Sequence, residues 1–199
     1  AEPTPIPSAH PDGARTTASS WVWSPVDNVS QSSADSHAAS MVVTQDGDAY
    51  SVWEEPLASA GAILYYSLRS GGDWSAPTSF FVGEEPDLAV SSDGVVHLVY
   101  ANEFAGQYDI FYTTWTGDGW ATPENVSNTS GTSSQPALAV KPDDGLILVW
   151  TDTTEGYNRI YYGWKDNGVW NTYFVPASSG GSAPDVAVGK NSRVWVTWQ

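Results

Sequence analysis

Apolar and polar positions alternate along this chain in a sequence pattern that repeats about every 50 residues. Each copy has a short strand of small apolar residues, a turn with Gly or Asn, and an alternating strand that closes on Trp or Tyr. A strand with paired aromatics and a further Trp follow. The opening residue stands 14 positions before the closing aromatic in every copy, and the pairs are Ala39 with Trp53, Pro86 with Tyr100, Pro136 with Trp150 and Pro184 with Trp198.

A period of about 40 to 50 residues with four strands per unit is typical of β-propellers. We therefore predict an all-β fold, a β-propeller of four-stranded antiparallel blades, with about three complete blades and a partial one. The complete blades are expected at about 39–82, 86–127 and 136–176, and the partial blade at 184–199. Turn residues such as Asp93-Gly94 suit the hairpins that connect adjacent strands of such a blade.

The segment that begins at Trp23 matches the segment that begins at Trp120 without a gap, which predicts an outer strand at 21–30 and propeller repeats over 21–199. An outer strand from the N-terminus would help to close the last blade and protect its edge. The shared blade would still lack a third strand. Three explanations stay open: a piece of a longer six- or seven-bladed protein, a ring completed by a second chain, or a small four-bladed ring with one thin blade.

Charge and composition argue against several classes of partner and chemistry. The 199 residues carry seven Lys and Arg against 23 Asp and Glu, a net charge of −16, which disfavours nucleic acid and anionic lipid as partners. No apolar run is long enough for a membrane span. The absence of cysteine excludes disulfides and thiol chemistry.

Residues 1–20 are rich in Pro, Ala, Ser and Thr and predict a flexible leader. They resemble a mature N-terminus left after signal removal, so we expect a secreted, extracellular protein. An engineered boundary would have the same appearance.

The turn between the third and fourth strands resembles the Asp-box of bacterial sialidase-like β-propellers, also called BNR repeats. The best match is Asp166-Asn167-Gly168-Val169-Trp170, and 118–120 and 72–74 are more degenerate. The chain is also similar to uncharacterised secreted propeller repeats of bacteria. The resemblance implies a structural role for Trp74, Trp120 and Trp170 between blades, and it implies no single activity.

Catalytic residues of a sialidase-like enzyme are not recognisable in the sequence. Such an enzyme would need three arginines around the substrate carboxylate, and only Arg159 of the four arginines stands near the expected ligand face. The three histidines lack zinc spacing, and His97 is expected to be a packed structural residue. Asp143-Asp144 fits a hairpin turn better than a calcium site. We predict no catalytic residue, metal or other cofactor, while leaving calcium open.

One face of a propeller gathers the connections from strand two to three and from each blade to the next, and ligands usually bind there. Equivalent polar residues stand two positions after three of the closing aromatics, and tyrosines and an arginine lie close to them in sequence. Carboxylates and amides beside Tyr suit sugar hydroxyls and sugar C–H faces, although ordinary solvated loops would contain similar residues. The candidate ligand residues are Glu55, Asn102, Tyr108, Asp152, Tyr157 and Arg159.

Together these features predict a secreted, non-enzymatic propeller module that binds glycans or protein partners at a cell surface. One alternative is a sialidase-like glycoside hydrolase whose catalytic residues lie on blades outside this chain. Another is a structural surface or assembly protein. Homo-oligomerisation and further blades of a longer chain both stay open.

Overall fold

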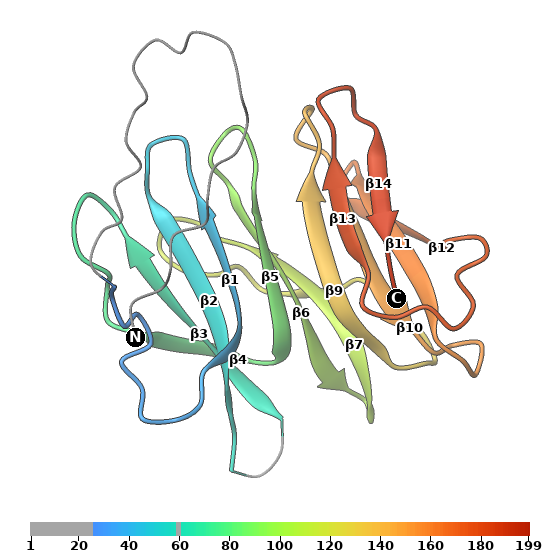
Figure 1. Cartoon of the computed structure of the whole chain (residues 1–199), viewed down its shortest axis with the longest axis horizontal. Coiled ribbons are helices and arrows are strands. Elements are labelled where there is room, and N and C mark those ends of the chain that lie inside the picture. The colour runs from blue at the N-terminus through green and yellow to red at the C-terminus, as the bar shows by residue number, and fades with distance from the viewer. Residues whose placement is uncertain (1–25, 59–60) are drawn as a thin grey trace, which may run out of the picture.

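The structure, a computed structural model, describes residues 26–58 and 61–199, and within them every regular element is a strand. No described segment forms a helix that could cross a membrane. Fourteen strands form three four-stranded antiparallel sheets and one two-stranded sheet (Figure 1). The predicted all-β propeller fold, with three complete blades and a partial one, is therefore confirmed.

Each sheet is built from strands that are consecutive in sequence, because short turns favour antiparallel pairing of neighbours. The first blade contains β1 His37–Val43, β2 Ala49–Pro56, β3 Ala62–Arg69 and β4 Thr78–Val82. The second contains β5 Glu84–Val90, β6 Val96–Phe104, β7 Gln107–Thr114 and β8 Glu124–Asn125. The third contains β9 Ser133–Val140, β10 Leu146–Asp152, β11 Arg159–Asp166 and β12 Val169–Phe174. The fourth sheet contains only β13 Asp185–Val188 and β14 Val194–Thr197.

Part of the predicted N-terminal organisation lies outside the described residues. The leader at 1–20 and Trp23 belong to that part. The described portion of the predicted outer strand, residues 26–30, forms bends and irregular backbone and does not pair with a sheet.

The first strand of each blade lies beside the first strand of the next. Contacts join β1 to β5, β5 to β9 and β9 to β13, so these four inner strands lie side by side in Figure 1. Small residues such as Ala89 and Ala139 occupy them, which fits the crowding expected near a propeller axis.

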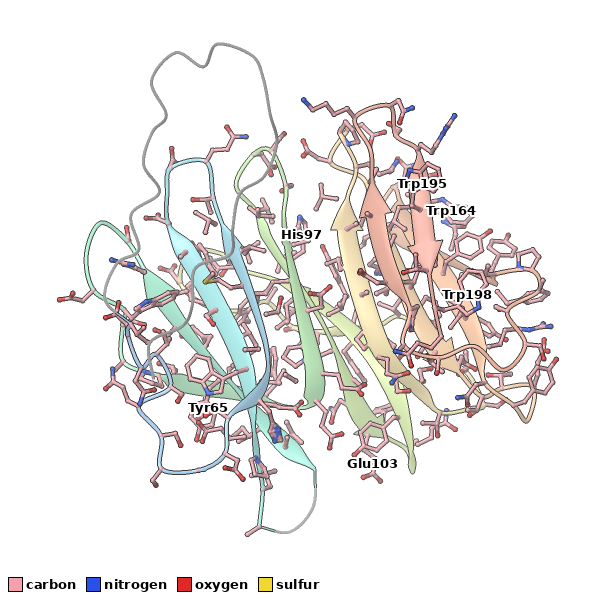
Figure 2. All side chains as sticks on the ribbon, viewed as in Figure 1. Tyr65, His97, Glu103, Trp164, Trp195 and Trp198 are labelled. Carbon is pink, nitrogen blue, oxygen red and sulfur yellow. The ribbon has the colours of Figure 1, made fainter. Side chains whose placement is uncertain are left out.

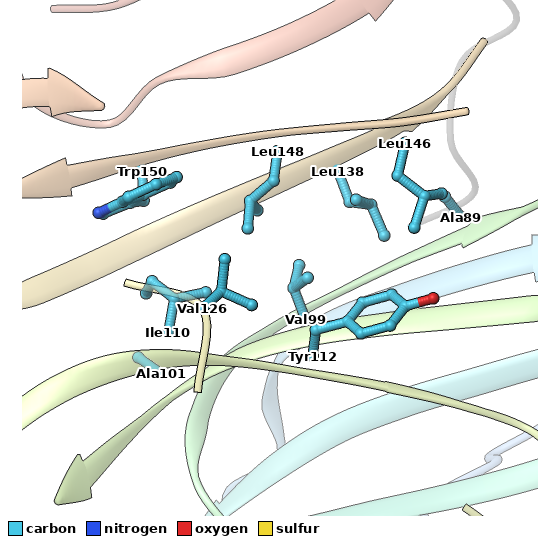
Figure 3. Close-up of a cluster of buried hydrophobic side chains, with 10 residues drawn as sticks. All are labelled: Ala89, Val99, Ala101, Ile110, Tyr112, Val126, Leu138, Leu146, Leu148 and Trp150. Atoms are coloured by element: carbon cyan, nitrogen blue, oxygen red, sulfur yellow. The ribbon is translucent and has the colours of Figure 1, made fainter. Parts of the chain in front are cut away.

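Apolar side chains fill the space between successive blades. In Figure 3, Leu138, Leu148 and Trp150 of the third blade face residues of the second blade that include Ile110 and Tyr112. A second cluster joins the first two blades, and a smaller one joins the third blade to β13. Alternate side chains of a strand point to opposite faces, so β6 and β10 each contribute to the interfaces on both of their sides. The blades are therefore held mainly by burial of apolar area between sheets.

The closing aromatic of each complete blade packs against an aromatic directly opposite in the third strand. The ring centroids are 6.0 Å apart for Trp53 and Tyr65, and 5.8 Å apart for both Tyr100 with Phe111 and Trp150 with Tyr161. These cross-strand pairs fix the register of the second and third strands.

Two of the tryptophans predicted to lie between blades do so. Trp120 packs on Tyr66 and Phe80 of the first blade, and Trp170 packs edge-on against Tyr112 of the second. Trp74 instead lines a small cavity with residues of the 26–31 segment.

His97 is buried, as the sequence predicts. Its Nδ1 lies 2.8 Å from the Tyr112 hydroxyl, and its Nε2 lies 3.3 Å from Ser91 Oγ. Burial lowers the pKa of this imidazole, so the neutral ring is the form that the core accommodates.

Trp150 and Trp198 occupy the same position of the repeat, but Trp150 is 0% exposed and Trp198 is 40% exposed. Trp150→Ala should lower the free energy of unfolding by about 3 to 5 kcal/mol, because it opens a cavity in the interface between blades. Trp198→Ala, its matched control, should cost less than about 2 kcal/mol. Urea unfolding monitored by circular dichroism measures both values, and equal losses would contradict the packing described above.

Candidate functional site

A cavity of about 430 Å³ opens where the four inner strands begin, and we call it the axial mouth. It has contributions from every blade at equivalent positions of the repeat. The lining residues are 38–40, 85–87, 135–137 and 183–185. Its position agrees with the face on which the blade-to-blade connections gather.

Each inner strand enters the axial mouth through a residue with left-handed backbone. The φ angles are 47° for Ala38, 54° for Glu85, 55° for Gln135 and 47° for Ala183. The pairing with the second strand shifts register beside the first three of them. Left-handed backbone is unfavourable for residues other than glycine, so contacts elsewhere must hold these bulges in place.

For Glu85, Gln135 and Ala183, those contacts come from side chains of the preceding blade. The backbone N–H of Glu85 donates to Glu54 Oε2 at 2.6 Å, and the N–H of Gln135 donates to Glu85 Oε2 at 2.6 Å. The N–H of Ala183 donates to Gln135 Oε1 at 2.9 Å. We call this series the inter-blade relay, because each acceptor belongs to one blade and each donor to the next.

A second set of inter-blade bonds lies two residues further along. Asp87 Oδ2 accepts the N–H of Leu138 at 2.7 Å, and Asp87 Oδ1 accepts the hydroxyl of Ser40 at 3.0 Å. The same hydroxyl oxygen of Ser40 accepts the N–H of Leu88 at 3.0 Å. Both carboxylate oxygens of Asp87 thus accept hydrogen bonds from other blades. Its counterpart Asp185 is exposed.

Several polar atoms of the axial mouth have no hydrogen-bond partner among the described residues. They are Glu85 Oε1, Gln135 Nε2 and Asp185 Oδ2. The first and third are acceptors and the second is a donor. The mouth therefore offers both kinds of hydrogen-bonding group to a ligand.

Burial raises the pKa of the Glu85 carboxyl, and the nearby charges of Glu54 and Glu84 add to the effect. Burial also raises the pKa of Asp87. In both cases hydrogen bonds from backbone N–H groups oppose the rise without cancelling it. The axial mouth is thus an acidic site in which added negative charge is unfavourable.

Two of the predicted ligand residues, Asp152 and Glu55, instead have structural roles within their blades. Asp152 is 0% exposed and accepts hydrogen bonds from Thr129 Oγ1, Ser133 Oγ and the N–H of Thr154, at 2.7 to 2.9 Å. The indole N–H of Trp150 lies 3.4 Å from the same carboxylate.

Glu55 has the same role in the first blade. It is buried and accepts bonds of 3.1 Å from the indole of Trp53 and from the hydroxyls of Ser32 and Ser36. Both carboxylates therefore fasten the connection that precedes their own blade, and neither is available to a ligand. This corrects their selection as ligand residues.

Asn102 and Tyr108 lie together in a small cleft of about 90 Å³ between the first and second blades. The Tyr108 hydroxyl donates to Glu84 Oε1 at 3.1 Å. Partial burial and this hydrogen bond raise the pKa of Tyr108, which keeps the phenol protonated.

Tyr157 and Arg159 form a separate cluster on the third blade. Glu155 accepts the Tyr157 hydroxyl at 2.6 Å and Arg159 Nη1 at 2.9 Å. The guanidinium of Arg159 also lies over the ring of Phe174, 4.2 Å from its centroid. The charge of Arg159 is thus paired within the blade, and none of the six predicted residues lines the axial mouth.

The sequence prediction does not include the residues of the mouth, because it follows the positions after the closing aromatics. A usable signal stood in the repeat itself, since Glu85, Gln135 and Ala183 each precede the proline that opens a copy. Glu85 and Gln135 are thus polar residues at equivalent positions of the repeat, as Glu55 and Asp152 are.

No group of three or more His, Asp or Glu among the described residues could hold a metal ion. The Asp143-Asp144 pair accepts hydrogen bonds within its own hairpin and from the second blade. Asp143 accepts the N–H of Gly145, and Asp144 accepts both the N–H and the hydroxyl of Ser92 at 2.7 Å.

No protein-family model matches the sequence, and a comparison with curated proteins gives no match either. Solved structures do match. The Hadza microbial sialidase Hz136 gives a TM-score of 0.63 at 12% identity over 76% of this chain, which spans 39% of the sialidase. An endo-arabinase from Bacteroides thetaiotaomicron gives 0.59 at 13% identity, covering 87% of this chain and 73% of the arabinase. A thermostable family-43 glycoside hydrolase gives 0.53 at 13% identity, covering 82% and 65%. At these identities the similarity establishes the fold, and the chain is a β-propeller of the kind found in sialidases and glycoside hydrolases.

Asp152→Ala should lower the free energy of unfolding by about 2 to 4 kcal/mol, because four donors, of which Ser133 and Trp150 are buried, lose their acceptor at once. Glu155→Ala on the exposed loop nearby should cost less than about 1 kcal/mol. Chemical denaturation measures both. A loss for Asp152→Ala no larger than that of its control would contradict the structural role.

Glu85→Gln should stabilise the protein at pH 7, because the amide keeps an acceptor for the N–H of Gln135 and removes a buried charge. A raised folded-state pKa means that the stability associated with Glu85 is fully present below the unfolded pKa and is lost as pH rises through the folded pKa. The gain should therefore shrink as pH falls toward 4.

Unfolding curves for the wild type and Glu85→Gln between pH 4 and 8 measure this dependence. Glu103→Gln removes the same charge from an exposed position and is the control. A stability gain that grows toward low pH would contradict the direction of the shift.

Proposed function

We propose that this chain is a non-enzymatic propeller module that binds glycans at the axial mouth. The observation that carries the proposal is the set of unpartnered polar atoms in a cavity of about 430 Å³. Glu85, Gln135 and Asp185 together offer acceptors and a donor, and a sugar hydroxyl needs both. Ala38, Ala39 and Ala183 supply apolar surface beside them, which suits the C–H faces of a sugar ring.

Electrostatics favour a neutral or cationic glycan. The mouth contains carboxylates and no Lys or Arg, so a sialylated or uronic-acid ligand would meet repulsion. The carbohydrate-active enzymes among the structural neighbours support a glycan as the ligand class. We also propose that the protein acts outside the cell, on the basis of the composition of residues 1–20.

A glycan microarray with the purified chain, with and without calcium, tests this proposal. We expect selective binding to neutral glycans that does not depend on calcium. A blank array from folded protein would contradict glycan binding and favour a protein partner or an assembly role.

Two variants assign the binding to the axial mouth. Gln135→Glu keeps the acceptor of the inter-blade relay but replaces the free amide donor with an acceptor, and it should weaken binding about tenfold or more. Asp185→Asn changes an exposed residue of the mouth and should weaken binding less. Asp46→Asn makes the same change of charge in a distant hairpin and is the matched control. Equal affinities for all three variants would exclude the mouth as the site.

A hydrolase is the second candidate, favoured by one observation. The axial mouth holds Glu85, whose pKa is raised, together with the exposed Asp185. Glycoside hydrolysis uses one protonated carboxyl and one carboxylate, so these two residues have the right chemistry in kind. Incubation of any glycan bound on the array with the protein, followed by mass spectrometry, separates the two candidates. Cleavage that Glu85→Gln abolishes would establish the enzyme and overturn the binding module.

A further inference from the structure

The hairpin that joins β6 to β7 extends beyond the inner strand of its own blade. β5 pairs with β6 as far as Glu84 and Ala101, and β6 then pairs only with β7, up to Phe104 and Gln107. Residues 102–104 thus carry the hairpin roughly 10 Å further, at the end where the axial mouth opens. Figure 2 shows Glu103 in this projecting part. We call residues 102–107 the blade-2 tip.

Phe104 presents an aromatic ring on the blade-2 tip. Its side chain is 55% exposed, and its ring packs edge-on against Phe111 with the centroids 6.2 Å apart. The turn that follows has φ angles of 55° at Ala105 and 89° at Gly106, as a tight two-residue hairpin turn requires. The hairpin and Phe111 therefore hold the exposed ring in a defined position.

The side-chain amide of Asn102 lies beside this ring. Asn102 and Phe104 alternate along β6, so their side chains are on the same face of the strand. Asn102 is half-buried in the small cleft between the first and second blades, and its amide forms no hydrogen bond among the described residues. An amide offers an acceptor oxygen and a donor nitrogen, which together suit two neighbouring sugar hydroxyls.

The cleft connects the blade-2 tip with the axial mouth. Tyr108 donates its hydroxyl to Glu84 Oε1 at 3.1 Å, and Glu84 Oε2 has no partner among the described residues. Glu84 lines the cleft, and the next residue, Glu85, lines the mouth. No Lys or Arg lines either space, so both favour a ligand without negative charge.

The surroundings of Phe104 argue for a sugar ring rather than a protein surface or a lipid as the occupant. The neighbours of the ring along the hairpin are Asn102, Glu103 and Gln107, which are polar. One aromatic ring among polar groups is too small an apolar area for a stable protein interface. It does match a pyranose, which has an apolar C–H face and a rim of hydroxyls.

We propose that the blade-2 tip is a second sugar subsite, in which a pyranose ring stacks on Phe104 and bonds through its hydroxyls to the amide of Asn102. This inference rests on the proposed function, because the glycan bound at the axial mouth continues past Glu84 to reach the tip. The ligand is therefore a neutral oligosaccharide chain. A disaccharide bound in the mouth leaves the tip empty, whereas a pentasaccharide covers both sites.

Isothermal titration calorimetry with disaccharides and pentasaccharides from the cellulose, xylan and mannan series tests the subsite. We expect the pentasaccharide of at least one series to bind about tenfold or more tightly than its disaccharide. Phe104→Ala should remove this gain and leave disaccharide binding unchanged. Phe104→Trp should retain the gain, because it keeps an aromatic face. Asn102→Ala should reduce it.

Two further variants serve as controls. Phe174→Ala removes a phenylalanine that is 44% exposed on the third blade, and it should leave the affinities of both ligands unchanged. Gln135→Glu acts in the axial mouth, so it should weaken disaccharide and pentasaccharide alike. Circular dichroism establishes that each variant remains folded.

The possible failures are distinguishable. If the pentasaccharides bind no more tightly than the disaccharides, or if Phe104→Ala keeps the gain, the second subsite is excluded and the axial mouth stands. If no oligosaccharide of the three series binds to the folded protein, the subsite and the binding of such glycans at the mouth are excluded together.

Discussion

The inter-blade relay is the constraint on which the axial end of this structure depends. Each inner strand begins with a residue in left-handed backbone, which is unfavourable on its own. For Glu85, Gln135 and Ala183, a side chain of the preceding blade accepts a hydrogen bond from the N–H of that residue and holds it in place. Apolar clusters between sheets fix the spacing of the blades, and the relay fixes how their inner strands meet.

The relay also determines what the axial mouth can bind. Glu85 and Gln135 each use one side-chain oxygen for the next blade and leave a second polar atom unpartnered. A structural bond thereby orients the groups that we propose for sugar recognition. Preorganised polar groups lose little freedom on binding, which favours affinity for small ligands.

The sequence predicts the blades well because the repeat is made of local features. Alternation, hairpin turns and closing aromatics specify pairing between neighbouring strands, and the three complete sheets follow them. The site is harder to predict. Trp150 and Asp152 are two residues apart and share one face of β10, so the indole and the carboxylate meet inside the blade. Glu55 and Asp152 therefore stand at equivalent positions because each carboxylate binds the indole N–H of the closing tryptophan in its own blade. Glu85 and Gln135 lie within bulges, where alternation no longer indicates the direction of a side chain.

We propose that the axial mouth is a ligand site whose polar groups are oriented by the inter-blade relay. The most direct measurement is amide chemical-shift mapping by NMR during titration with a glycan that the protein binds. We expect the largest shifts at Glu85, Gln135 and Ala183, whose N–H groups belong to the relay. Shifts confined to the hairpins around Gly47 and Gly94 would contradict this proposal.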